Sequence, residues 1–98
     1  MKKIVIIEDD IEINTLLADF LRENGYAVHC QYDGLHVLDF LRKEKIDLII
    51  LDIMLPYRSG DIILSDVRKK FTIPVIIFQR KKLHKNKSTC FVWEQTII

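Results

Sequence analysis

Apolar residues follow two patterns along the first 78 residues of the chain: short continuous runs, and stripes at helical spacing. The run Leu48–Leu51 contains only leucine and isoleucine, which is typical of a strand buried on both faces of a parallel sheet. Between Ile13 and Leu21, apolar residues recur three and four positions apart and would form one buried helical stripe. These patterns predict three helices, beginning near residues 11, 34 and 60, that alternate with four strands, 3–7, 26–31, 46–51 and 75–78.

Residues that start and stop helices agree with this order. Asp10 can cap the first helix, and Asn24-Gly25 can end it. Cations in the last turn of the third helix, Arg68-Lys69-Lys70, complement the helix dipole. Strands and helices that alternate through short connections predict an α/β fold with a parallel sheet and right-handed crossovers.

The composition, 49% hydrophobic and 30% charged over 98 residues, is that of one globular domain with a modest core. No apolar run approaches the roughly 20 residues of a membrane span, and no signal-peptide pattern opens the chain. Cys30 and Cys90 have no metal-ligand spacing and are expected to be reduced thiols. We therefore expect a cytoplasmic protein without a membrane partner.

Charge divides the chain near Phe78. Residues 1–78 carry ten Lys or Arg and thirteen Asp or Glu, whereas residues 79–98 carry five and one. We therefore expect a folded domain over 1–78 and a poorly ordered basic tail over 79–98. Phe91 and Trp93 could let such a tail stack on nucleic acid, and a plain disordered tail is the simpler alternative.

Carboxylates follow two of the predicted strands at the point where each ends. Glu8 and Asp9 come directly after the first strand, and Asp52 follows the third. Reaction sites of open α/β sheets lie beyond the carboxyl ends of the strands, so these side chains would meet if the two strands are neighbours. Several carboxylates in a small volume repel one another unless a cation neutralises them, and oxygen ligands of this kind suit Mg²⁺.

The order and spacing of these motifs resemble the receiver domain of bacterial two-component response regulators. The resemblance covers about four-fifths of the chain and rests on four motifs: Glu8-Asp9-Asp10, Leu51–Pro56, Gly60 and Ile73–Ile77. It implies a flavodoxin-like, doubly wound parallel sheet with strand order 2-1-3-4. Leu51–Pro56 is most similar to the transcription-factor subfamily that carries a winged-helix output domain.

The resemblance also implies a chemistry and a partner. Asp52 would accept a phosphoryl group from a phosphohistidine on a sensor histidine kinase, as a signalling module and not as an enzyme. Glu8, Asp9 and Asp52 would bind Mg²⁺ together with the backbone carbonyl of Met54. Phosphoryl transfer depends mainly on positioning and charge neutralisation, which such a site supplies.

The chain departs from the family after its fourth strand. The family has a Ser or Thr hydroxyl there, where this chain has Gln79, and no fifth strand with a following Lys is recognisable. Back-translation of residues 78–98, read two bases later in each codon, permits a receiver-like continuation through Gly-Ala-Asp-Asp-Tyr. We therefore expect an incomplete receiver, lacking the fifth strand and the last helices, whose tail is translated out of frame.

An incomplete sheet has physical consequences. Residues 75–78 would form an exposed apolar edge, which invites self-association, and the protein would be marginally stable. The family responds to phosphorylation through the Ser or Thr hydroxyl and the Lys, and we call these its switch residues. Without them or an output domain, the module would be defective and would not contact DNA directly.

Two other functions compete with this interpretation. A small phosphatase of the haloacid-dehalogenase type also uses an aspartate after a parallel strand, but it needs a second Asp where this chain has Met54. A module that binds a partner without phosphorylation, or a non-functional remnant, is the remaining alternative.

Overall fold

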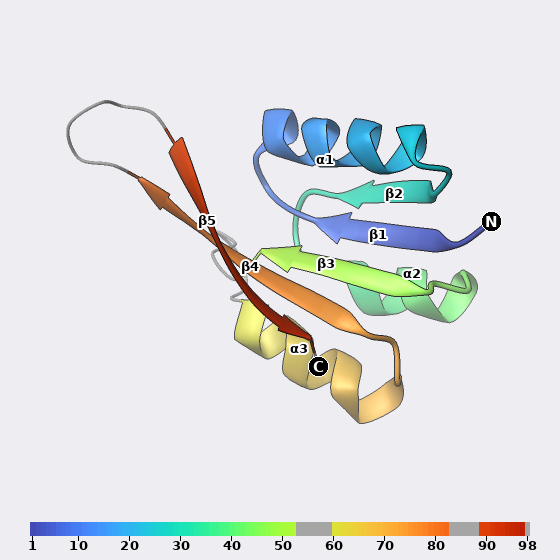
Figure 1. The fold of residues 1–98 in the computed structure, drawn as a ribbon. Coiled ribbons are helices and arrows are strands. Elements are labelled where there is room, and N and C mark those ends of the chain that lie inside the picture. The colour runs from blue at the N-terminus through green and yellow to red at the C-terminus, as the bar shows by residue number, and fades with distance from the viewer. Residues whose placement is uncertain (53–59, 83–88, 98) are drawn as a thin grey trace.

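The residues that the structure describes form three helices and a five-stranded sheet (Figure 1). The computed structural model describes residues 1–52, 60–82 and 89–97, and beyond Phe78 it describes the backbone alone. In chain order the elements are β1 (Lys3–Ile7), α1 (Ile11–Glu23), β2 (Ala27–Gln31), α2 (Val37–Lys43), β3 (Leu48–Asp52), α3 (Gly60–Lys70), β4 (Val75–Lys82) and β5 (Thr89–Ile97). Strands β2, β1, β3 and β4 are parallel neighbours in that order, which confirms the predicted arrangement.

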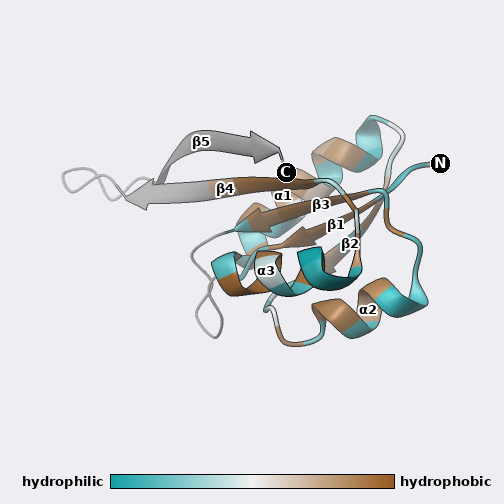
Figure 2. Cartoon of the chain, turned by 90° about the horizontal axis from the view of Figure 1, so that it is seen from below, coloured by the Kyte–Doolittle hydropathy of each residue, from teal (hydrophilic) through white to brown (hydrophobic). Residues whose placement is uncertain are grey.

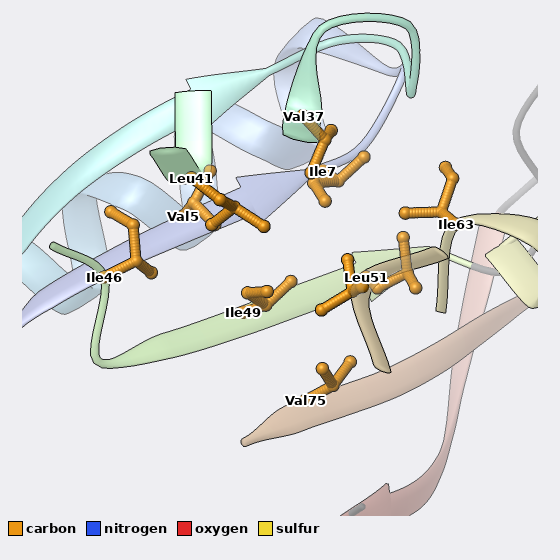
Figure 3. Close-up of a cluster of buried hydrophobic side chains, with 10 residues drawn as sticks. Val5, Ile7, Val37, Leu41, Ile46, Ile49, Leu51, Ile63 and Val75 are labelled. Atoms are coloured by element: carbon orange, nitrogen blue, oxygen red, sulfur yellow. The ribbon is translucent and has the colours of Figure 1, made fainter. Parts of the chain in front are cut away.

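The two faces of the sheet are covered by different helices, with α1 on one face and α2 and α3 on the other (Figure 2). Alternate residues of β1 divide between them: Ile4 and Ile6 pack on the α1 side, whereas Val5 and Ile7 pack toward α2 and α3. The larger cluster joins strand residues to Val37, Leu41, Ile63 and Val67 of the helices, as Figure 3 shows in part. Continuous apolar strands are therefore buried on both faces, as the sequence predicts.

Helix α1 begins and ends at the predicted signals. The Oδ1 atom of Asp10 accepts a hydrogen bond from the backbone N–H of Ile13 at 3.2 Å. At the other end, Gly25 has a φ of 89°, a left-handed conformation that a side chain would strain. Helix α2 begins at Val37, slightly later than residue 34, where the pattern placed its start.

The C-terminal segment differs from the expectation. β4 continues to Lys82, and Thr89–Ile97 form β5, which pairs antiparallel with β4. β5 is not the parallel fifth strand that the family resemblance implies, so the described fold is an incomplete receiver, as expected. The expectation of an open β4 edge is wrong, because β5 pairs along that edge. β-Branched and aromatic residues such as Val92 and Trp93 favour strands, and pairing satisfies backbone groups that an open edge would leave free.

Within the described ranges, no helix is both long and apolar enough to cross a membrane.

Candidate functional site

Three carboxylates meet at the carboxyl ends of β1 and β3. These strands are parallel neighbours in which Ile7 lies opposite Leu51, so the residues that follow, Glu8 and Asp52, lie side by side. Carboxylate oxygens of Glu8, Asp9 and Asp52 all lie within 4.8 Å of one another. The sequence-based prediction that these three side chains come together is confirmed by this geometry.

Burial makes the cluster unusual. The side chains of Glu8 and Asp52 are both 0% exposed, and Asp9 is half-buried. Buried carboxylates are rare unless hydrogen bonds, opposite charges or metal ions compensate for their lost hydration. We call Glu8, Asp9 and Asp52 the acidic cluster.

Local backbone structure at the end of β1 sets the positions of these acids. The N–H of Glu8 donates to the backbone oxygen of Gln31 at 3.0 Å, which continues the pairing of β1 with β2 by one residue. Oε1 of Glu8 accepts a hydrogen bond from the N–H of Asp10 at 3.2 Å. Asp10 caps α1, so the acidic residues divide their roles: Asp10 starts the helix, whereas Glu8 and Asp9 face Asp52.

The donor set fits a hard divalent cation. Mg²⁺ is held in proteins by one or two carboxylates, with waters and phosphate oxygens completing the coordination. The acidic cluster offers three carboxylates at one polar edge of the sheet and no sulfur or imidazole ligand. Of the predicted ligands, the backbone carbonyl of Met54 lies outside the described residues.

Sequence reasoning missed one residue beside the cluster. Asn14 is 0% exposed in α1, and its Nδ2 donates to the backbone oxygens of Glu8 and Gln31, at 3.1 Å each. The available signal was a polar residue beside Ile13 on the side of the helix that faces the sheet. That signal was weak, because the acceptors are backbone atoms whose proximity the sequence does not reveal.

Comparison with known proteins places this geometry in context. The model of the response regulator receiver domain matches residues 4–94, and this range passes the predicted boundary at residue 78 and ends within β5. The chain is 32% identical to the response regulator TrrA of Thermotoga maritima, solved in complex with Mg²⁺-BeF, with 81% of this chain and 70% of that one covered and a TM-score of 0.76. It is 33% identical to the BeF3-activated N-terminal receiver domain of Klebsiella pneumoniae RstA, with 87% and 71% covered and a TM-score of 0.76. A chemotaxis response regulator of Vibrio cholerae is 26% identical, with 89% and 75% covered and a TM-score of 0.77.

Proposed function

The chain belongs to the response regulator receiver domain family, and on that premise we propose that Asp52 is the phosphoacceptor of a two-component phosphorelay. The observation that carries this proposal is the acidic cluster itself: Asp52 ends the central strand and its carboxylate lies within 4.8 Å of those of Glu8 and Asp9. The phosphodonor would be a phosphohistidine of a sensor histidine kinase. An oxygen of Asp52 would bond to phosphorus as the P–N bond breaks, which leaves an acyl phosphate on Asp52 and an imidazole on the donor.

The proposal also assigns the acidic cluster to a cation site. Glu8 and Asp9 would hold Mg²⁺ together with Asp52, and the carbonyl of Met54 is a further proposed ligand. When bound, the cation supplies positive charge that neutralises the carboxylates and the phosphoryl oxygens. The burial of Asp52 at the strand end restricts the positions that its carboxylate can take.

We propose that the module responds poorly to phosphorylation, because one of the family's switch residues is missing. Asp52 lies opposite Phe78 in the register of β3 and β4, so residue 79 is the first position beyond the phosphoacceptor on the neighbouring strand. The family resemblance places a Ser or Thr hydroxyl there, and this chain has Gln79. An acyl phosphate on Asp52 would thus lack the hydroxyl that contacts it in the family, and we propose that it forms slowly or is lost quickly.

Labelling with a small phosphodonor tests the phosphoacceptor. The chain is incubated with acetyl phosphate and Mg²⁺, and the modified residue is located by mass spectrometry after borohydride trapping. We expect modification at Asp52 that EDTA abolishes and that Asp52→Asn eliminates. Asp61→Asn is the matched control, because Asp61 is an exposed carboxylate of α3, and it should label like the wild type.

Two results would contradict the proposal: modification that persists in Asp52→Asn, or labelling of the wild type that does not depend on Mg²⁺. Complete absence of labelling, together with binding of a partner that ignores Asp52, would instead favour an interaction module that works without phosphorylation.

A further inference from the structure

Asn14 connects three segments at the edge of the acidic cluster. Its backbone N–H donates to the oxygen of Asp10 at 2.9 Å, within the first turn of α1. Its side-chain Nδ2 donates at 3.1 Å to the oxygen of Glu8, at the end of β1, and at 3.1 Å to that of Gln31, at the end of β2. One buried amide thus joins the start of a helix to the ends of two strands.

These contacts hold the backbone of Glu8 on both sides. The N–H of Glu8 donates to Gln31, and its carbonyl accepts from Asn14. That carbonyl belongs to the peptide group between Glu8 and Asp9, so fixing it fixes the plane from which the Asp9 side chain departs. A rotation of this peptide would move the carboxylate of Asp9 relative to Asp52.

The Asn14 side chain has a cost in stability beside its two hydrogen bonds. Its Oδ1 is buried and accepts no hydrogen bond from the residues that the structure describes, and a buried acceptor without a partner costs free energy. An apolar side chain of similar size would avoid this cost, but it would take a hydrogen-bond donor away from the backbone oxygens of Glu8 and Gln31.

We propose that Asn14 is a positioning residue for the acidic cluster: its amide holds the Glu8–Asp9 peptide so that the three carboxylates converge on one cation. This inference rests on the proposed function, because it assigns Asn14 to the Mg²⁺ site. Groups that orient metal ligands from outside the coordination sphere commonly change metal affinity by about 10-fold to 100-fold when removed. We expect a weakening of Mg²⁺ binding of about 10-fold when the Asn14 amide is lost.

The test measures Mg²⁺ affinity by isothermal titration calorimetry on four chains of the same 98 residues, the wild type and three variants. Asn14→Leu replaces the amide by an apolar group of similar size, and Asn14→Ala removes the same donor if the leucine variant does not fold. Ala18→Gly is the control, because Ala18 is fully buried one turn later in α1 and packs among apolar side chains of the sheet. Thermal unfolding of each variant shows how far its stability has changed.

We expect both Asn14 variants to bind Mg²⁺ about 10-fold more weakly than wild type, and Ala18→Gly to bind it like wild type even where its melting temperature falls equally. The amide resonances of Asp9 and Asp10 should shift in the Asn14 variants before any Mg²⁺ is added. Equal affinity in wild type and both Asn14 variants would overturn the inference and leave the proposed function intact. A wild-type chain that binds no Mg²⁺ would instead overturn the proposed function, and the inference with it.

Discussion

Glu8 and Asp52 lie beside each other at the ends of two parallel strands, both fully buried and both carboxylates within 4.8 Å of Asp9. Placing like charges so close in a region away from water opposes folding, unless a cation compensates. The same arrangement favours binding of a cation, because the repulsion is relieved when the ion enters. The stability of the fold and the chemistry of the site are therefore coupled through these two side chains.

Neutralising Asp52 should stabilise the chain in the absence of metal. Without Mg²⁺, Asp52→Asn is expected to raise the free energy of unfolding by about 1 kcal/mol or more, because one buried negative charge is removed from the acidic cluster. With Mg²⁺ at about 100 times its dissociation constant, the wild type should gain about 2.7 kcal/mol, and Asp52→Asn much less. Thermal unfolding in EDTA and in excess Mg²⁺ measures both effects.

Asp19→Asn is the control for this comparison, because Asp19 is an exposed carboxylate of α1 whose ion pair with Arg22 spans 3.8 Å. Surface pairs of this kind contribute little, so its stability should change slightly and equally in both conditions. An Asp52→Asn variant that unfolds more easily than wild type in EDTA would show that repulsion within the cluster is not the dominant effect.

Restoring a hydroxyl after Phe78 should improve the proposed switch. Residue 79 is the first position beyond Asp52 on the neighbouring strand, and Gln79→Thr would supply the hydroxyl that the family has there. We expect more phosphorylated Asp52, or a longer lifetime of the acyl phosphate, in Gln79→Thr than in wild type. Gln79→Val introduces a side chain of the same shape as threonine but without the hydroxyl. Equal labelling of the threonine and valine variants would therefore refute a role for the hydroxyl.

The parallel part of the fold could be predicted because its signals are local. Apolar runs mark β1, β3 and β4, and the carboxylates that follow β1 and β3 are visible as sequence neighbours of those runs. Once alternating strands and helices predict a parallel sheet, the strand ends must share one edge, and the meeting of Glu8, Asp9 and Asp52 follows.

Two features could not be predicted, because each depends on pairing between distant backbone atoms. β5 was not predicted because Thr89–Ile97 pair antiparallel with β4, outside the alternation of strands and helices that predicts the parallel part of the sheet. The role of Asn14 was missed because its acceptors, the oxygens of Glu8 and Gln31, lie six and seventeen residues away. Neither feature leaves a repeating pattern of apolar residues.

Disrupting β5 should expose β4 and cause self-association. Two adjacent prolines, Phe91→Pro with Val92→Pro, remove the N–H that faces β4 whichever of the two residues donates. We expect a shift to larger species than wild type in size-exclusion chromatography with light scattering, because an apolar edge becomes available for pairing. The double alanine variant at the same positions keeps both N–H groups and should elute like wild type. If the proline and alanine variants associate equally, the side chains of β5 and not its backbone pairing protect the β4 edge.

Acid should destabilise the chain through His29, which stacks on Phe40 with ring centroids 4.0 Å apart and an interplanar angle of 14°. Burial, and secondarily the positive charge of Lys3, lowers the pKa of His29 below its ordinary value of 6.5. The folded state thus favours the neutral ring. This agrees with the contact of 3.0 Å between Nε2 of His29 and the side-chain Nε2 of Gln31, because an amide NH₂ can donate only to a ring nitrogen that carries no proton. The neutral His29 ring therefore contributes to the free energy of unfolding above pH 6.5. This contribution is lost as the pH falls below 6.5 toward the lowered pKa of the folded state.

We expect His29→Phe, which keeps an aromatic ring but cannot take up a proton, to lose less stability than wild type between pH 7.5 and pH 5.5. The difference should be well under the roughly 1.4 kcal/mol that one full pKa unit represents, because the His29 side chain is only partly buried. A lowered pKa of Glu44, caused mainly by its hydrogen bond from Lys3, adds a loss of the same sign only below its ordinary value of 4.5, outside this interval. Urea unfolding at each pH gives the comparison, with the exposed His36→Phe as control, and identical pH profiles for wild type and His29→Phe would exclude His29 as the acid-sensitive group.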